Sequence, residues 1–167
     1  MLKNFVSSML AILLLAGCGG SGGSQSGETQ STETAVSCAE MAQTLVNELD
    51  MADVVTEAKT RIVYGSFFNA REGDEGLPVS DAAAFVPAEK NSDQVAVFRT
   101  DDADTVKNLL NDYLSAQKAL SEMYSPEEVF KISNAVIDTS NDGSVVVLIV
   151  CNDIEKAKTA AASVLGK

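Results

Sequence analysis

Apolar residues recur at helical spacing in three segments of the chain. A Ser-x-x-Glu capping box at Ser37 and Glu40 opens the first segment. The acidic run 101–104 opens the second, and Pro126 ends it because the residue before a proline resists helical angles. The predicted apolar face of this long helix comprises Val106, Leu109, Leu110, Tyr113, Leu120 and Tyr124. The third predicted helix covers residues 154–165, with its alanines facing inward.

Short apolar runs between these segments predict strands. Residues 54–64 combine helix-favouring and strand-favouring residues, and we interpret them as a helix or turn that gives way to a strand at 60–68. The segments 81–86 and 94–100 flank a predicted turn and indicate an antiparallel hairpin. A charged loop with several glycines is expected over residues 69–78.

The last strands are predicted to form a second hairpin. Residues 130–137 are expected to be a strand, and Asp142-Gly143 is a strong hairpin signal. Residues 145–150 are apolar without alternation, which is typical of a central strand covered on both faces. The order of elements predicts an α+β fold in which an antiparallel sheet of about four to five strands carries the helices.

The first eighteen residues follow the order of a signal peptide. Lys3 provides a positive charge ahead of an apolar run from Phe5 to Leu15. This run is too short to span a membrane, because a membrane-spanning helix needs about 20 residues. The run ends in Leu15-Ala16-Gly17-Cys18, which resembles the lipobox of bacterial lipoproteins. This resemblance implies a diacylglyceryl group on the Cys18 thiol and cleavage that removes residues 1–17. We therefore expect a lipid-anchored protein on the extracytoplasmic face of the membrane.

Residues 18–36 contain Gly, Ser, Thr, Gln and Glu and almost no apolar residue after the cysteine. Such a composition cannot bury a core and predicts a flexible tether with a typical reach of about 25 Å. The expected organisation is a signal peptide at 1–17, the lipidated cysteine and tether at 18–36, and one α+β domain at 37–167.

Charge and composition restrict the chemistry. The formal net charge is −12, which argues against nucleic acid as a partner. The chain has no histidine, which excludes Ser-His-Asp and Cys-His catalysis and the usual zinc ligand sets. We expect no cofactor and no metal. The Asp138, Ser140, Asp142 and Gly143 spacing imitates part of a calcium loop, but a hairpin turn explains these residues better.

Residues in the second half of the chain resemble a protein family. The pattern consists of Gln117, the segment Tyr124-Ser125-Pro126-Glu127-Glu128, Asn134-Ala135-Val136, Gly143 and a valine-rich last strand. It resembles a domain-of-unknown-function family of small Gram-positive bacterial lipoproteins, over roughly residues 95–164. The family has no established activity, so the resemblance implies a cellular location and a fold but assigns no catalytic residue.

Cys38 and Cys151 are the cysteines that remain once Cys18 carries lipid. Outside the cytoplasm they can form a disulfide, worth about 4–5 kcal/mol in the chain-entropy model because it closes a long loop. The alternative is two free thiols, with one of them buried in the sheet.

Four residues are candidates for a binding site. Arg71 lies in the charged loop, and Tyr64 stands beside it, although an aromatic residue on a strand usually belongs to the core. Tyr124 and Pro126 lie in the family motif, where the ring is expected to cover the sheet and the proline to end the helix. This composition favours a binding module over an enzyme. The expected partners of the module are the membrane, through the lipid on Cys18, and an envelope protein, peptide or glycan. The alternative is an enzyme or accessory subunit that uses paired carboxylates on envelope material.

Overall fold

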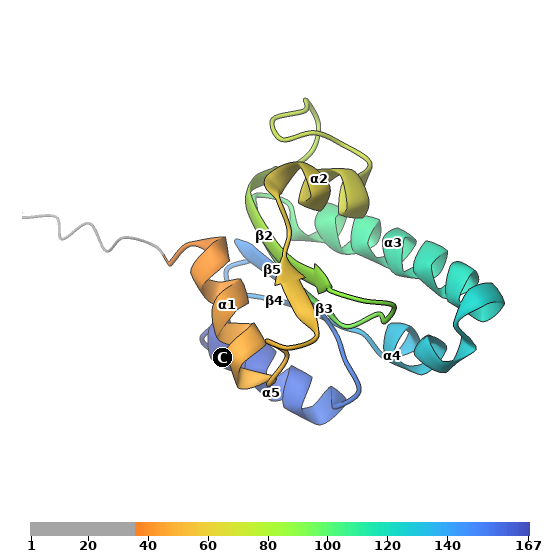
Figure 1. Cartoon of the computed structure of the whole chain (residues 1–167). Helices are drawn as coiled ribbons and strands as arrows, with labels where there is room; N and C mark the ends of the chain where they lie inside the picture. The colour runs from red at the N-terminus through yellow and green to blue at the C-terminus, as the bar shows by residue number, and fades with distance from the viewer. Residues whose placement is uncertain (1–35) are drawn as a thin grey trace, which may run out of the picture. The chain divides into compact units, whose positions relative to one another are not determined.

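The computed structural model describes residues 36–167. They form a five-stranded antiparallel sheet in the order β1-β2-β3-β5-β4, with helices packed on it (Figure 1), which confirms the predicted α+β fold. In chain order the elements are α1 (Cys38–Glu48), β1 (Val55–Glu57), α2 (Thr60–Phe68), β2 (Val79–Pro87), β3 (Gln94–Thr100), α3 (Ala103–Tyr124), the 3-10 turn η1 (Pro126–Glu128), α4 (Val129–Ser133), β4 (Val136–Thr139), β5 (Val145–Val150) and α5 (Ile154–Val164). The predicted signal peptide, the lipobox with Cys18, and the tether up to residue 35 lie outside the described residues.

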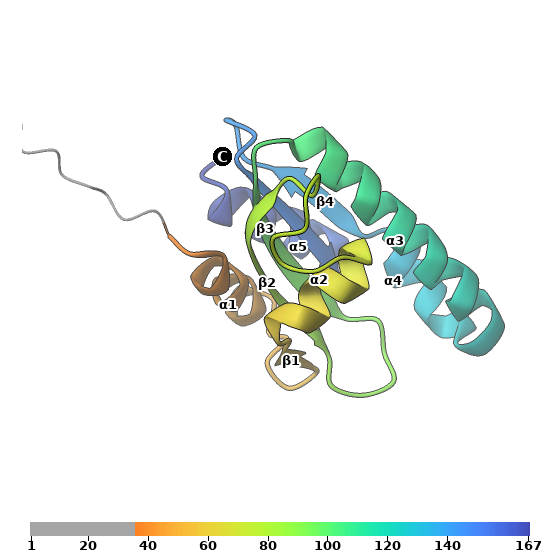
Figure 2. The same cartoon turned by 90° about the horizontal axis from the view of Figure 1, so that it is seen from above.

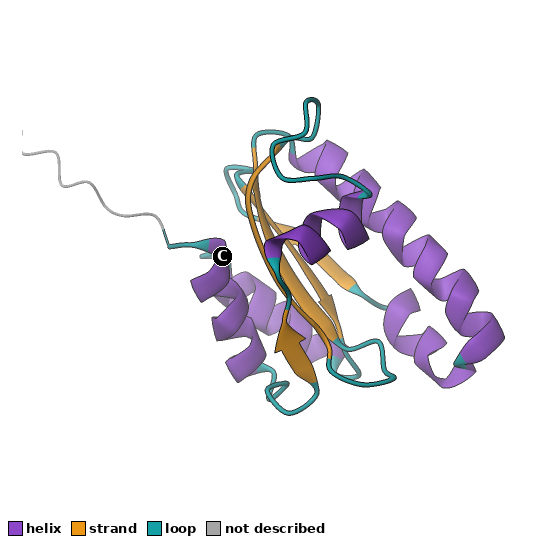
Figure 3. Cartoon of the chain, turned by 45° about the horizontal axis from the view of Figure 1, so that its top comes forward, coloured by secondary structure: helices purple, strands orange, loops and turns teal. Residues whose placement is uncertain are grey.

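The sheet is the middle of three layers. Helices α1 and α5 cover one face, while α2 and α3 cover the other (Figures 2 and 3). Strand β5 lies between β3 and β4 and is buried along its whole length. Val145, Val147 and Ile149 enter the core under α1 and α5, whereas Val146, Leu148 and Val150 enter the core under α2 and α3. The predicted central strand is confirmed, since strand residues alternate between the two faces.

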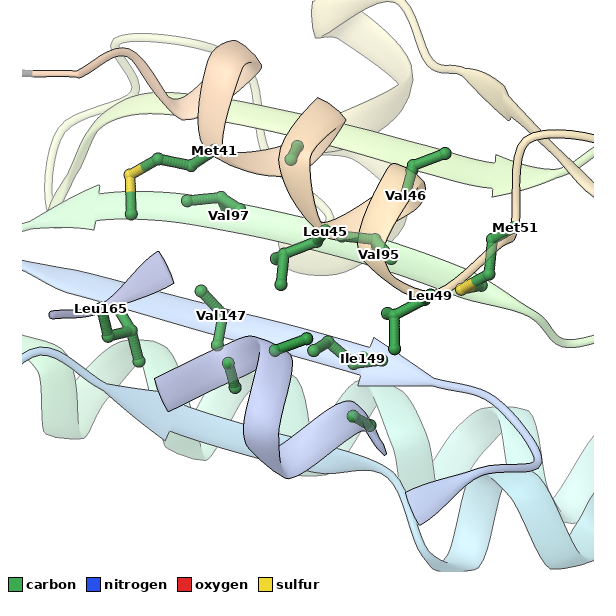
Figure 4. Packing of buried hydrophobic residues seen from close by; sticks show 14 of the residues in the cluster. Met41, Leu45, Val46, Leu49, Met51, Val95, Val97, Val147, Ile149 and Leu165 are labelled. Carbon is green, nitrogen blue, oxygen red and sulfur yellow. The ribbon is translucent and has the colours of Figure 1, made fainter. Parts of the chain in front are cut away.

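Helix α1 begins where the capping box predicts. Ser37 Oγ accepts from the Glu40 backbone N–H at 3.2 Å, and the Glu40 carboxylate accepts from the Ser37 backbone N–H at 3.0 Å. Apolar side chains of α1 then face the sheet residues Val95, Val97 and Val147 (Figure 4). Helix α5 packs beside α1 through small residues, which lets both helices lie close to the strands.

The prediction of a strand at residues 60–68 is wrong, because this segment is helix α2. Its β-branched and aromatic residues suggested a strand, but Val63, Tyr64 and Phe67 form one buried face at helical spacing. The Phe67 ring lies 4.7 Å from the Tyr113 ring and 5.5 Å from the Phe98 ring, measured between centroids. Tertiary packing of these aromatic rings outweighs the weak local preference for a strand.

The predicted strand at 130–137 is only partly correct. Its first part is helical, because Pro126 opens η1 and the chain continues directly into α4. A helical turn here directs Lys131 into a buried cluster of carboxylates, and β4 starts only at Val136. The hairpin of β4 and β5 around Gly143 is confirmed, with a φ angle of 75° at that glycine.

Helix α3 is longer than the sheet that it covers. Its 22 residues span about 33 Å, compared with about 20 Å for the six residues of β5. Val106 and Leu110 are buried, but Leu120 and Tyr124 are exposed. The apolar face predicted for its last two turns therefore does not cover the sheet, and the end of α3 projects beyond the layer (Figure 2).

The two cysteines of the domain are free and lie at opposite ends of the sheet. Cys38 is buried, and its thiol donates to the carbonyl of Asp81, which pairs with Arg99 and through it with Val145. Cys151 follows the other end of β5, about 20 Å away along the strand at about 3.3 Å per residue. A disulfide needs Cα atoms within about 7 Å. Both thiols are unbonded in the structure, and the buried one, Cys38, lies at the start of α1 and not in the sheet as the alternative expected.

Candidate functional site

A groove of about 810 Å³ lies where α3 extends past the sheet. Its lining comes from α2, from the end of β2 and the turn into β3, from the C-terminal half of α3, and from residues 125–132. Ligand pockets in proteins typically measure about 300–1,000 Å³. This groove is larger than the hollows of about 440 and 390 Å³ elsewhere on the domain, and we take it as the candidate binding site.

The floor of the groove is apolar and fixed by the core. Phe67 of α2, Val86 of β2 and Ile132 of α4 line it. Phe67 contacts the rings of Tyr113 and Phe98, which hold it in one orientation. The floor of the groove is therefore continuous with the packed core of the domain.

Gln94 at the start of β3 places a polar group in this floor. Only 3% of the residue is exposed, and its Oε1 accepts a hydrogen bond of 2.9 Å from the Tyr113 hydroxyl. Burial raises the pKa of Tyr113, although the hydrogen bond acts in the opposite direction, so the hydroxyl remains a donor at neutral pH. Gln94 lines the groove, and its amide nitrogen makes no hydrogen bond to any residue between 36 and 167.

A buried ion cluster supports the wall next to Gln94. Lys131 Nζ lies 2.9 Å from Asp93 Oδ2 and 3.0 Å from Glu128 Oε2, and only 9% of the lysine side chain is exposed. The backbone N–H and the hydroxyl of Ser92 both donate to the same Glu128 oxygen. These contacts join η1 and α4 to the turn between β2 and β3, so that two distant segments form one wall.

The hydrogen bonds of the cluster outweigh its burial. Burial alone acts to raise the pKa of Glu128, but donation from Ser92 and Lys131 lowers the pKa overall. Burial likewise acts to lower the pKa of Lys131, yet its hydrogen bonds to Asp93 and Glu128 raise it. Glu128 and Lys131 thus stay charged at neutral pH, and Glu128 is poorly suited to donate a proton.

The rim of the groove exposes apolar side chains. Tyr124, at the end of α3, is 76% exposed, and Ile62 on α2 is 40% exposed; both line the groove. Leu120, Met123 and Phe130 are also exposed nearby but do not line the groove.

The sequence located part of this site. Tyr124 lines the groove, but its ring does not cover the sheet as predicted. Pro126 ends α3 and opens the turn that carries Glu128, without lining the groove itself. Tyr64 is 1% exposed and lies in the core, and Arg71 lies in the exposed loop after α2. Neither of these two reaches the groove.

Gln94, Glu128 and Lys131 were not predicted as site residues. Gln94 and Lys131 each occur next to apolar residues, and the local sequence does not indicate which distant residue such a polar side chain contacts. Glu128 could have been found, because Gln117, Tyr124, Ser125 and Glu128 of the family motif all line the groove. The family motif therefore indicates the site more accurately than the choice of candidates by side-chain type, such as Tyr64 and Arg71.

The turn at residues 140–144 is held by its own side chains. Asp142 accepts hydrogen bonds from the hydroxyls of Ser140 and Ser144 and from the Ser144 backbone N–H, which lowers its pKa to about 2. The carboxylate thus serves the hairpin, as the sequence indicates. Residues 36–167 contain no group of three potential metal-ligating side chains. Among them there is also no helix with the length and hydropathy needed to cross a membrane.

The fold and groove define a small α+β domain with a hollow at one end of its sheet. Residues 78–151 of this domain match the family model described as "Domain of unknown function (DUF4358)", which confirms the predicted resemblance to a family of unknown function. The matched segment starts earlier and ends earlier than the predicted 95–164. It contains every part of the groove except the wall formed by α2. No curated protein and no solved structure matches the chain.

Proposed function

We propose that the protein is a lipid-anchored domain that binds a component of the cell envelope in the groove without transforming it. The observation that supports this most directly is the groove itself, with its apolar floor, the Gln94 amide in its lining and the exposed aromatic ring of Tyr124. Concave sites that combine an apolar surface with a few placed polar groups are typical ligand sites.

The sequence supports the anchor. The run that ends in Leu15-Ala16-Gly17-Cys18 has the form of a lipobox, and two or three acyl chains on one cysteine give lasting membrane attachment. The described chain begins at Val36, whose carbonyl accepts a hydrogen bond of 2.7 Å from Arg99. Arg99 and Gln94 lie near opposite ends of β3, about 17 Å apart at about 3.3 Å per residue. If the tether joins the domain at Val36, the groove lies at the opposite end of the sheet from the tether. In this arrangement the groove is accessible to a partner outside the membrane.

The groove favours binding over the carboxylate-based alternative. A glycosidase-like reaction needs two carboxyl groups about 5–10 Å apart in one cleft, one of them able to donate a proton. Glu128 is the one carboxylate that lines the groove among the described residues. It is occupied by Ser92 and Lys131, and its pKa is lowered.

Two measurements test this proposal. Mass spectrometry of the protein purified from membranes should find a diacylglyceryl group on Cys18 and residues 1–17 removed. An unmodified Cys18 in protein released from the cells contradicts the anchor.

Binding in the groove is tested with envelope fragments prepared from the expressing bacterium. The full chain, in a detergent without sugar headgroups, is sedimented with the fragments, and the bound fraction is measured. Ser121→Trp places a large ring in the groove and should reduce binding at least tenfold. Met123→Trp, on the same helix but outside the lining, should change binding less than twofold. Equal binding by both variants, or no sedimentation of the wild type, contradicts a binding role of the groove.

A further inference from the structure

We infer that the ligand of the groove is a neutral oligosaccharide segment of the envelope. This inference rests on the proposed function and specifies its ligand class. Three properties of the lining carry it: its balance of charge, its density of uncharged hydrogen-bonding groups, and the aromatic ring at its mouth.

The groove is nearly neutral in a strongly acidic protein. The chain carries 24 acidic and 12 basic residues, whereas the lining contains one of each, Glu128 and Lys90. Lys131 beneath the wall compensates Glu128 further. A cationic ligand would be attracted to many other parts of this surface, and an anionic one would be repelled by the protein as a whole. The lining therefore selects for a ligand without charge.

Uncharged donors and acceptors surround the groove. They are Ser66, Asn91, Gln94, Gln117, Ser121 and Ser125. Hydroxyl and amide groups can both donate and accept, which matches the hydroxyl groups of a sugar because these do the same. Gln94 adds a fixed element, since the Tyr113 hydroxyl donates to its Oε1 and holds the amide in place, while its N–H groups make no hydrogen bond to another residue between 36 and 167. A ligand oxygen that accepts from this amide would gain specificity as well as affinity.

Tyr124 provides a surface for a sugar ring. Its side chain is 76% exposed at the mouth of the groove, and the apolar floor of Phe67 and Ile132 lies further in. The C–H face of a pyranose is apolar and packs against the negative face of an aromatic ring. Apolar side chains of a peptide would instead need anchoring pockets, and the exposed apolar residues Leu120 and Met123 lie outside the lining.

The direct test is calorimetric titration of the full chain, in the same sugar-free detergent, with the neutral trisaccharides chitotriose, maltotriose and cellotriose. At least one should bind to the wild type. Tyr124→Ala removes an exposed ring without disturbing the core and should weaken binding at least tenfold. Gln94→Leu keeps the buried volume but removes the donors and should also weaken binding at least tenfold. Met123→Ala is the matched control and should change affinity less than twofold.

Failure of this inference can be separated from failure of the proposed function. Envelope fragments are treated either with periodate or with a protease. Periodate cleaves the vicinal diols of hexose chains to aldehydes while itself being reduced, but leaves internal 1,4-linked N-acetylhexosamines intact. Loss of groove-dependent sedimentation after periodate, or its persistence together with binding of chitotriose, supports the inference. Loss after protease alone, together with no binding of the three trisaccharides, overturns it in favour of a peptide ligand and leaves the binding role intact. Trisaccharide binding that is unaffected by Tyr124→Ala and Gln94→Leu also overturns it.

Discussion

Replacing Lys131 by methionine tests the role of the buried ion cluster in holding the wall of the groove. Methionine keeps much of the apolar stem of the lysine but leaves the carboxylates of Asp93 and Glu128 close together without a cation. Removing one partner of a buried ion pair costs about 3–5 kcal/mol. The side chains here are only 9%, 14% and 13% exposed, so solvent screens them little. Because Ser92 still donates to Glu128, we expect the lower end, about 3 kcal/mol.

The loss should be visible in thermal unfolding followed by far-ultraviolet circular dichroism. For a domain of this size a loss of 3 kcal/mol lowers the Tm by roughly 10 °C. Lys158→Met is the matched control, since its ion pair with Glu155 is exposed and such pairs contribute about 0–1 kcal/mol. Glu128→Gln should cost less than Lys131→Met, because one carboxylate still faces the lysine. Equal stability of the Lys131→Met and Lys158→Met variants refutes the assignment of a supporting role to the cluster.

The pH dependence of this loss follows from the two pKa directions. The pKa of Glu128 is lowered by folding, so its contribution is complete above the unfolded value of about 4.3 and disappears as the pH falls through the folded value. The pKa of Lys131 is raised, so its contribution is complete below about 10.4 and disappears as the pH rises through the folded value. The stability difference between the wild type and Lys131→Met should therefore shrink as the pH rises above about 10, and on the acid side it should shrink once the carboxylates left without a cation in the variant take up a proton.

Three further predictions concern the framework. Burial and the neighbouring Asp81 raise the pKa of the Cys38 thiol to about 12. Iodoacetamide at pH 8 should therefore label Cys151 in the native protein and both cysteines only after denaturation, as measured by peptide mass mapping. Rapid labelling of Cys38 in the native protein contradicts its burial. Ser37→Ala removes the capping box of α1 and should cost about 1 kcal/mol in urea unfolding, an expectation that an unchanged midpoint would reject. Gly143→Ala forces a side chain into a φ of 75° and should cost about 1–2 kcal/mol, whereas a neutral effect shows that the turn relaxes.

Elements with strong local signals were predictable from the sequence. The capping box located the start of α1 at the correct residue, and Asp142-Gly143 located the second hairpin. The uninterrupted valines of β5 indicated that both faces of the strand are covered, which the two cores confirm. In each case the physical cause lies within a few neighbouring residues.

The failures have causes that are distant in the sequence. Helix α2 forms because its aromatic face meets Phe98 and Tyr113, and no local preference encodes that contact. Lys131 is buried because Asp93, 38 residues earlier, is placed beside it by the sheet. The groove itself exists because α3 is longer than the strands it covers. Composition and local spacing could suggest Tyr124, but only the fold brings it to the same hollow as Gln94.

Strand β3 runs from the residue that contacts Val36 to the groove. Arg99, near one end of β3, holds the carbonyl of Val36, and Gln94, at the other end, borders the groove. The line from Val36 to the groove therefore runs along β3, parallel to its flanking strands β2 and β5. The hydrogen bonds between antiparallel strands lie perpendicular to that direction. They share a load along this line in shear instead of breaking one after another, so the sheet resists a pull between Val36 and the groove.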